Sequence, residues 1–390
     1  MKRFEIIDGM RGYFLVFMLI NHLTFTGGYL LVEINHRQLA FVEDAQGFVF
    51  LSGFLIGLVY GKKMLKGGYE DGRSKVWARA FELYRYAIGV ILAVLLVRLA
   101  LPGDDHWQAW LGDTALGDPK RLLMVATFIF QPTFMDILPQ YIIYMIFAPP
   151  LIWLCLQGKW MHVAVGSIIV WMAGQLGLHR LVTDPIDILA VGSDDQGLRA
   201  AFNLLGWQIV FFSALILGAL TARNEIDWGR VFSPERSWVP KMALAICLFF
   251  MPLRIMTAHG LMPGDLLPKF AAMEVRADFG PVYLLNFAAV GVGVAWLVIA
   301  GPRHAYAPVR RVAEAVIWVF SLKFLRLLGR HSLQVYVWHV GIVYSVQLLN
   351  EAVPDASQLT RIAIALTCIV LLSVPALWRE RSARRKTAPA

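Results

Sequence analysis

Long apolar stretches, separated by short polar segments, run through the whole chain. A helix needs about 20 largely apolar residues to cross a bilayer. Stretches of this kind predict spanning helices over residues 12–31, 42–60, 84–101, 137–156, 160–177, 204–222, 241–257, 281–300, 331–349 and 360–378. The pattern therefore predicts an all-α fold: a polytopic transmembrane helix bundle of about ten spanning helices.

Two further apolar stretches differ from these spans. Residues 122–135 form a short stretch that contains Pro132, and a crossing there would invert the side of every later loop. Residues 312–328 include Lys323 and Arg326, which is typical of an amphipathic helix lying at the membrane interface. We expect neither stretch to cross the membrane.

Composition and charge support a membrane location. Hydrophobic residues make up 58% of the chain and charged residues only 16%, whereas a soluble domain carries about a quarter charged residues. The net charge of +9 comes from 36 Lys and Arg residues against 27 Asp and Glu residues. Most of these cations fall on alternate segments, as in cytoplasmic loops, rather than on a nucleic-acid-binding surface. We expect cytoplasmic N- and C-termini, one integral membrane domain over residues 1–378, and a basic, disordered cytoplasmic tail over residues 379–390.

The first predicted span carries the densest set of polar side chains, namely Asp8, Arg11, Asn21 and His22. Arg11 and His22 are eleven residues apart, so they share one helix face at a separation of about 16 Å. His22 is expected near the bilayer midplane, where burial keeps an imidazole neutral and suited to general-base chemistry. Asp8 can pair with Arg11 on the helix surface. The alternative is that His22 only hydrogen-bonds a neighbouring helix.

Small residues follow at four-residue spacing in the second predicted span. Gly53, Gly57 and Gly61 let helix backbones approach closely. Helix packing is favoured over a nucleophilic role for Ser52, because no G-x-S-x-G motif surrounds this serine.

Cations follow the second predicted span. They suit the phosphates of a cytosolic donor such as an acyl-CoA, but they equally suit anionic lipids or a simple topology signal. The candidates for donor binding here are Lys62, Lys63, Arg79 and Arg85, together with Ser52.

Other polar and aromatic side chains lie within or beside later spans. A water-filled cavity would account for them, although arginines near an outer interface can also extend their side chains to water. The candidates for substrate binding are His339, Trp338, Asp136, Gln140, Arg98 and Arg254.

Several types of site receive no support from the sequence. The three cysteines show no C-x-x-C spacing, so neither a disulfide framework nor a metal site is predicted. The sequence contains no G-x-x-x-x-G-K-[ST], G-x-G-x-x-G or H-E-x-x-H motif, so nucleotide hydrolysis and zinc hydrolase chemistry are not supported.

A joint pattern of motifs resembles a known family. The segments IIDGMRGYFLVFMLINH, EDAQGFVFLSGFLIGLVYG, RAFELYRYA, QPTFMDILPQYIIY, FNLLGWQIVFFSALILGA and LGRHSLQVYVWHV cover the chain from about residue 3 to residue 350. Together they resemble the OpgC family, within the acyltransferase family 3 of membrane acyltransferases. Two features depart from the usual pattern: Arg79 and Arg85 are six residues apart, where the wider family has a closer pair of arginines, and Gln46 stands where many members have an acidic residue.

The resemblance implies a ten-helix membrane O-acyltransferase in the bacterial inner membrane. Its donor would be a cytoplasmic acyl-CoA, with succinyl-CoA implied for OpgC-like members. Its acceptor would be an osmoregulated periplasmic glucan or another carbohydrate. The family's essential arginine and histidine carry over to Arg11 and His22. Membrane lipids are expected partners, nucleic acid is not, and no permanently bound cofactor or metal is expected.

The resulting hypothesis makes His22 the general base and lets Arg11, Arg79 and Arg85 neutralise donor phosphates, with Asp8 orienting Arg11. A transient acyl-histidine remains open as a variant, and Arg98 or Arg254 is a candidate partner for a succinyl carboxylate. The alternatives are a transporter or flippase of a glycan or lipid using a buried-histidine proton relay, and a non-enzymatic scaffold. The scarcity of carboxylates in the predicted spans favours the acyltransferase.

Overall fold

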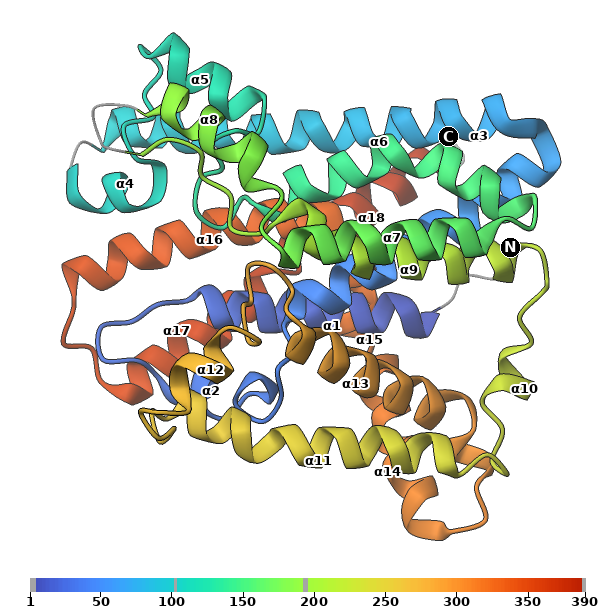
Figure 1. The fold of residues 1–390 in the computed structure, drawn as a ribbon. Coiled ribbons are helices and arrows are strands. Elements are labelled where there is room, and N and C mark those ends of the chain that lie inside the picture. Colours follow the sequence, from blue (N-terminus) through green and yellow to red (C-terminus); the bar gives the residue numbers. More distant parts are fainter. Residues whose placement is uncertain (1–4, 102–103, 192–195, 388–390) are drawn as a thin grey trace. The chain divides into compact units, whose positions relative to one another are not determined.

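The computed structural model describes residues 5–101, 104–191 and 196–387 (Figure 1). This part of the chain is helical and contains no β-strand, apart from one isolated bridge between Phe130 and Arg199. The chain divides into two compact units. Unit 1 consists of Met1–Phe48, Asp227–Glu274 and Pro281–Ala390, and unit 2 consists of Val49–Ile226 and Val275–Gly280.

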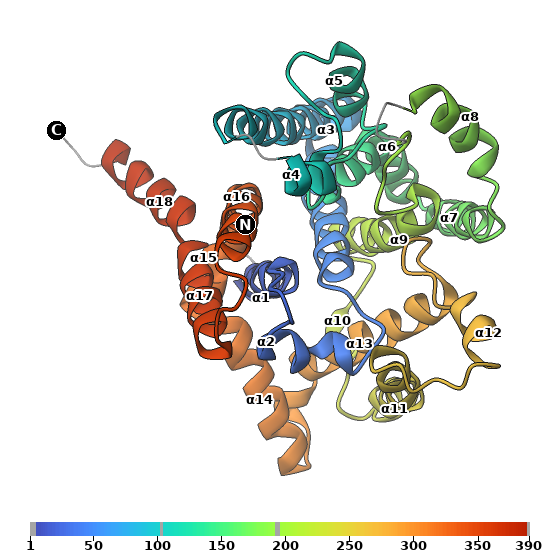
Figure 2. The same cartoon turned by 90° about the vertical axis from the view of Figure 1, so that its left-hand side faces the viewer.

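Unit 1 contains the first helix and most of the C-terminal half. Its helices are α1 (Glu5–His22), α2 (Leu30–Glu33), η1 (His36–Gln38), the first turn of α3 (Asp44–Ala100), α10 (Trp228–Val231), α11 (Trp238–Ala258), α12 (Leu267–Ala271), α13 (Pro281–Ile299), η2 (Gly301–Arg303), α14 (Ala307–Ser321), α15 (Lys323–Arg330), α16 (Ser332–Ala352), α17 (Gln358–Leu371) and α18 (Val374–Thr387). Figure 2 shows α1 beside α15 and α16.

Glycines bring α1 into backbone contact with α14 and α15. A methyl group at Gly9 would overlap the carbonyl of Phe320, and one at Gly12 would overlap that of Leu325. A methyl group at Gly329 would likewise overlap the carbonyl of Asp8. Small residues at such contacts allow helices in a membrane to pack at short distance. The position of α1 therefore depends on these glycines.

The predicted span 12–31 is wrong in its bounds, because α1 begins at Glu5 and ends at His22. Gly27 and Gly28 follow with φ angles of 80° and 71°, a left-handed backbone that a continuing helix does not adopt. The Tyr29 hydroxyl donates a hydrogen bond to the Ile20 carbonyl at 2.5 Å and holds the turn against α1. His22 is consequently the last residue of α1 rather than a residue in the middle of a helix.

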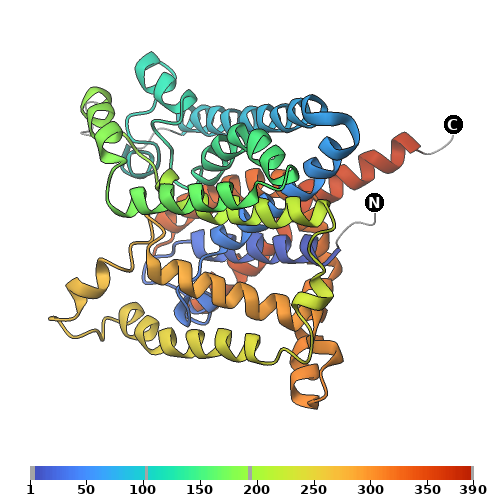
Figure 3. The same cartoon turned by 45° about the vertical axis from the view of Figure 1, so that its right-hand side comes forward.

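Unit 2 contains the rest of α3, followed by α4 (Asp104–Leu111), α5 (Pro119–Ala126), α6 (Ile137–Leu156), α7 (Trp160–Gln175), α8 (Arg180–Ala190) and α9 (Leu204–Ala222). The helix α3 holds two predicted spans, 42–60 and 84–101. The segment predicted to be a loop between them is helical except at Gly68, which has a φ of 83° and a ψ of 174°. Figure 3 shows the chain reversing at this break.

The predicted packing role of the small residues in α3 is confirmed. Methyl groups at Gly53 and Gly57 would overlap the carbonyls of Phe211 and Leu215 on α9. Gly61 approaches the same helix, since its Cβ would lie 3.1 Å from the Cβ of Ala222. The backbones of α3 and α9 are therefore in close contact within unit 2.

Six helices in the described residues are long and apolar enough to cross a membrane, or up to seven if α7 and α8, bent by 54°, form one span. The helix α3 counts once among the six, although it contains two of the predicted spans. The helix α1 is not among them, because it carries three charged residues, Glu5, Asp8 and Arg11. The chain is a multi-pass membrane protein. The number of about ten spans and the cytoplasmic side of both termini remain predictions.

Two predictions for the C-terminal half are wrong. The expected single helix over 312–328 is two helices, because Leu322 takes an extended ψ of 127° between α14 and α15. The tail expected to be disordered after Trp378 is helical up to Thr387, and residues 388–390 lie outside the described part of the chain. Glu380 lies 3.5 Å from Arg330, an ion pair that anchors α18.

Candidate functional site

The central feature of unit 1 is a contact between two histidines. His22 Nδ1 at the end of α1 lies 3.1 Å from His339 Nε2 on α16. His339 is fully buried, whereas His22 is partly exposed. His339 Nδ1 lies 2.5 Å from the backbone carbonyl of Tyr336. The structure therefore brings together a predicted catalytic residue and a predicted substrate-binding residue that are 317 positions apart in the sequence.

Arg11 and Asp8 lie on the same helix as His22. The guanidinium carbon of Arg11 stands 5.2 Å from the centroid of the Phe48 ring, a cation–π contact. Asp8 is buried, and its backbone carbonyl packs against Gly329 of α15. One continuous helix thus carries all three predicted catalytic residues, while the pairing of Asp8 with Arg11 remains a prediction.

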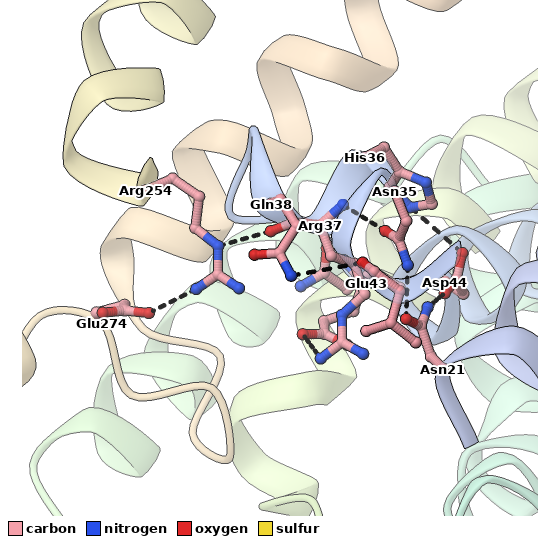
Figure 4. A network of polar contacts seen from close by, with 11 residues as sticks. Asn21, Asn35, His36, Arg37, Gln38, Glu43, Asp44, Arg254 and Glu274 are labelled. Carbon is pink, nitrogen blue, oxygen red and sulfur yellow. Dashed lines mark hydrogen bonds and ion pairs between the residues drawn. The ribbon is translucent and has the colours of Figure 1, made fainter. Parts of the chain in front are cut away.

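A second polar cluster surrounds Asp44, at the start of α3 (Figure 4). Asn21 Nδ2 donates to Asp44 Oδ2 at 2.7 Å, and His36 Nε2 lies 3.3 Å from Asp44 Oδ1. The Tyr13 hydroxyl contacts the other ring nitrogen of His36 at 3.3 Å. Asn35 Nδ2 donates to Asn21 Oδ1 at 2.6 Å. These bonds hold residues 35–44 against α1.

The cluster continues toward α11 through arginines and carboxylates (Figure 4). Arg37 pairs with the buried Glu43 at 3.0 Å. Arg254 Nε donates to the Arg37 carbonyl at 2.6 Å, and Arg254 Nη1 lies 3.5 Å from Glu274 Oε1. Burial raises the pKa of Glu274, and the charge of Arg254 opposes this shift. The predicted substrate-binding residue Arg254 therefore tethers η1, which contains Arg37.

Gln46 has a clear local role. Its side-chain Oε1 accepts a hydrogen bond from the backbone N–H of Glu43 at 3.0 Å. Because α3 begins at Asp44, this is the bond that the third helical residue makes to the N-cap position in a capping box. Gln46 therefore stabilises the start of α3.

The predicted donor-binding residues lie on α3 in unit 2. Ser52 is buried, the Lys63 ammonium stands 4.7 Å from the Tyr60 ring centroid, and the nearby Lys62 is partly exposed. Arg79 Nη1 pairs with Glu82 at 2.5 Å, and the Arg85 guanidinium stands 5.3 Å from the Phe81 ring centroid. Six residues of helix place Arg79 and Arg85 about 120° apart, so they do not share a face. Their role in donor binding remains a prediction.

Three predicted substrate-binding residues belong to unit 2. Gln140 is buried and donates to the Tyr144 hydroxyl at 3.1 Å. Arg98 donates to the carbonyls of Gly112 and Thr114 at 3.0 Å and 2.7 Å, respectively, and so anchors a loop. Asp136 precedes α6; desolvation raises the pKa of its carboxyl, an effect that backbone N–H groups and two arginines oppose. Their role in substrate binding remains a prediction.

Trp338 does not take part in the histidine contact, although it precedes His339 in the sequence. Its indole Nε1 donates to the backbone carbonyl of Leu371 at 3.0 Å, which links α16 to α17. Sequence reasoning missed His36 and Asp44 as members of a cluster. Their signal is the polar run NHRQ at 35–38, followed by the acidic pair at 43–44, directly before an apolar helix.

Within the described residues, no group of three or more His, Cys, Asp or Glu side chains is arranged to hold a metal ion. The contact of His22 with His339 is therefore not part of such a group in the described residues. The arrangement allows hydrogen bonding and proton transfer between imidazoles.

The sequence comparison assigns the family. The family described as OpgC protein matches residues 2–384, nearly the whole chain, so the protein belongs to the OpgC family. This membership points to an acyltransferase-type enzyme that modifies glucans. No curated protein and no solved structure matches the chain significantly.

Proposed function

We propose that this protein transfers an acyl group, namely a succinyl group, from a cytoplasmic acyl-CoA to hydroxyls of a periplasmic glucan. The observation that carries the proposal is the contact of His22 with His339, in a chain that belongs to the OpgC family. An imidazole can accept a hydroxyl proton near neutral pH. The bacterial inner membrane is the proposed location, because the donor and the acceptor lie on its opposite sides.

The reaction follows general-base chemistry. His22 accepts the proton of a glucan hydroxyl while the hydroxyl oxygen bonds to the thioester carbonyl carbon. The carbon–sulfur bond then breaks, and the leaving thiolate takes the proton from the His22 imidazolium to give the free thiol of CoA. His22 ends the cycle unprotonated and ready for another hydroxyl.

Cations are proposed to bind the donor. Arg11 lies on the helix of His22, and a guanidinium there can neutralise phosphate or a succinyl carboxylate. Ser52, Lys62, Lys63, Arg79 and Arg85 remain the proposed donor-binding residues of α3. No observation favours the transporter or flippase alternative.

The test compares periplasmic glucans from cells with and without the gene, by mass and by charge. Transfer of succinyl groups adds both mass and negative charge, whereas acetyl transfer adds mass alone. We expect cells that carry the gene to make glucan with added negative charge, and His22→Gln at an equal protein level to make it about 10³-fold more slowly. Purified protein in nanodiscs, supplied with succinyl-CoA or acetyl-CoA and unmodified glucan, then identifies the donor.

Glucans of unchanged mass in cells that contain the wild-type protein would contradict the proposed activity. Charged products at the wild-type level in His22→Gln would contradict the role of His22 while leaving the activity standing. A preference for acetyl-CoA would overturn the succinyl assignment alone.

A further inference from the structure

The position of His339 determines where its ring carries a proton. Its Nδ1 lies 2.5 Å from the carbonyl oxygen of Tyr336, and a carbonyl oxygen can only accept a hydrogen bond. His339 Nδ1 must therefore be the protonated nitrogen in this contact. His339 is fully buried, and burial in an apolar environment disfavours a charged imidazolium. In its neutral form, His339 carries a lone pair on Nε2.

The contact between the two rings then determines where His22 carries its proton. His339 Nε2 faces His22 Nδ1 at 3.1 Å. Because the lone pair is on His339 Nε2, the hydrogen in this bond belongs to His22 Nδ1. A neutral imidazole carries only one N–H, so the lone pair of His22 is then on Nε2. Starting from the Tyr336 carbonyl, the two hydrogen bonds therefore determine the tautomer of His339 and then that of His22.

We propose that His339 is a positioning residue: it holds His22 in the Nδ1–H tautomer and so makes Nε2 the atom that accepts the substrate proton. The proposal rests on the proposed function for the reaction, but the tautomer itself can be observed without turnover. When His22 accepts a proton, its Nδ1–H continues to donate to the neutral His339 Nε2. This bond then becomes charge-assisted and stronger.

The role resembles that of the carboxylate in a Ser-His-Asp triad, which orients the imidazole and stabilises the imidazolium. Here the acceptor is a neutral ring, which is easier to bury than an unpaired carboxylate. The two rings come from different helices, α1 and α16, so their hydrogen bond also fixes the orientation of the His22 ring. Packing alone would require only the volume of His339, whereas this role requires an acceptor at its Nε2 position.

Three substitutions separate these two requirements. His339→Gln places an amide oxygen near the original Nε2 and can accept from His22 Nδ1–H. His339→Leu fills a similar volume without an acceptor, and His339→Asn is polar but too short to reach His22. We expect His339→Gln to retain at least a tenth of the wild-type kcat, and the Leu and Asn variants to lose about 100-fold or more. The KM for the acyl-CoA should change by less than about 3-fold, because His339 does not bind the donor.

The tautomer is measured directly by ¹⁵N NMR of histidine-labelled full-length protein in nanodiscs without substrate. His22→Gln and His339→Gln assign the signals by their loss. We expect Nδ1 of His22 to be protonated and Nε2 to be unprotonated, with the coupling of a hydrogen bond between the two rings. In His339→Leu, the His22 signals should shift toward a mixture of tautomers.

A protonated Nε2 and an unprotonated Nδ1 on His22 in the wild-type protein would overturn the proposal. Equal kcat values for folded His339→Leu and wild type would also overturn it, as would equal losses in folded His339→Gln and His339→Leu. If the Leu variant does not fold, the wild-type spectrum decides the tautomer. If the wild type transfers no acyl group but shows the expected tautomer, the proposed function fails and the assignment of protons stands.

Discussion

Two histidines of unit 1, His36 and His22, differ in their surroundings. Both ring nitrogens of His36 contact protein groups: Nε2 lies beside the Asp44 carboxylate, and Nδ1 contacts the Tyr13 hydroxyl. His22 uses Nδ1 on another imidazole, and the proton order in that pair places its lone pair on Nε2. The contacts of His36 join η1 to α1 and α3, whereas the contact of His22 with His339 determines which of its own nitrogens can accept a proton.

Replacing each histidine by glutamine should have the most different effects on the rate. We expect His22→Gln to lower the rate of acyl transfer by about 10³-fold, because loss of a general base costs 10²–10⁴-fold. His36→Gln serves as the matched control and should lower the rate by less than about 10-fold. The measurement is the release of CoA thiol by purified variants in nanodiscs, normalised to folded protein. Similar losses in the two variants would show that the histidines do not differ in role.

The next largest effect concerns the stability of the Asp44 cluster. Asp44→Ala removes the buried carboxylate that accepts a hydrogen bond from Asn21 and lies against His36, which should cost about 3 kcal/mol. Asp44→Asn keeps an oxygen for Asn21 and should cost less. Thermal unfolding in detergent measures both variants, and kcat per folded molecule should stay near that of the wild type. A lowered kcat at unchanged stability would place Asp44 in the chemistry instead.

The next prediction concerns the close contact that Gly12 allows between α1 and α15. Gly12→Ala would press a methyl group against the Leu325 carbonyl, and overpacking of this kind costs about 2 kcal/mol. Gly341→Ala is the matched control, because a methyl group there meets no atom within 4 Å and alanine favours a helix. We expect thermal unfolding at a lower temperature for Gly12→Ala alone. Equal unfolding temperatures for the two variants would argue against a tight contact.

The smallest expected effect concerns the cap of α3. Gln46→Ala removes the bond to the Glu43 N–H and should cost about 1 kcal/mol, whereas Gln46→Glu keeps the acceptor and should cost less. Thermal unfolding of the two variants, with transfer activity as a second readout, checks this. A loss of activity larger than the loss of folded protein would give Gln46 a role in the reaction.

The helices could largely be predicted from the sequence, because apolar length is a local property. The spans 137–156 and 204–222 coincide with α6 and α9. The end of α1 at His22 could not, because the apolar stretch continues beyond it and does not report the turn that follows, where Gly27 and Gly28 are left-handed. The helical tail depends on contacts such as that of Glu380 with Arg330, which sequence periodicity does not report.

In the candidate site, too, some features could be predicted from the sequence and others could not. Arg11 and His22 stand out because polar residues are rare in an apolar helix and these two share a face. The partnership of His22 with His339 links residues 317 positions apart, so no local pattern contains it. The cluster of His36 and Asp44 forms only when a short polar loop folds back on α1, and its residues look like an ordinary loop in the sequence.

Whether His22 is the general base is decided by the pH dependence of kcat/KM for acyl transfer by the wild type and by His22→Gln. A general base must be unprotonated to act, so the wild-type rate should rise with pH through one ionisation and then level off. The residual activity of His22→Gln should lack this rise, while His36→Gln should keep it. A rise of the same shape and midpoint in His22→Gln would contradict the account, because another group would then be the base.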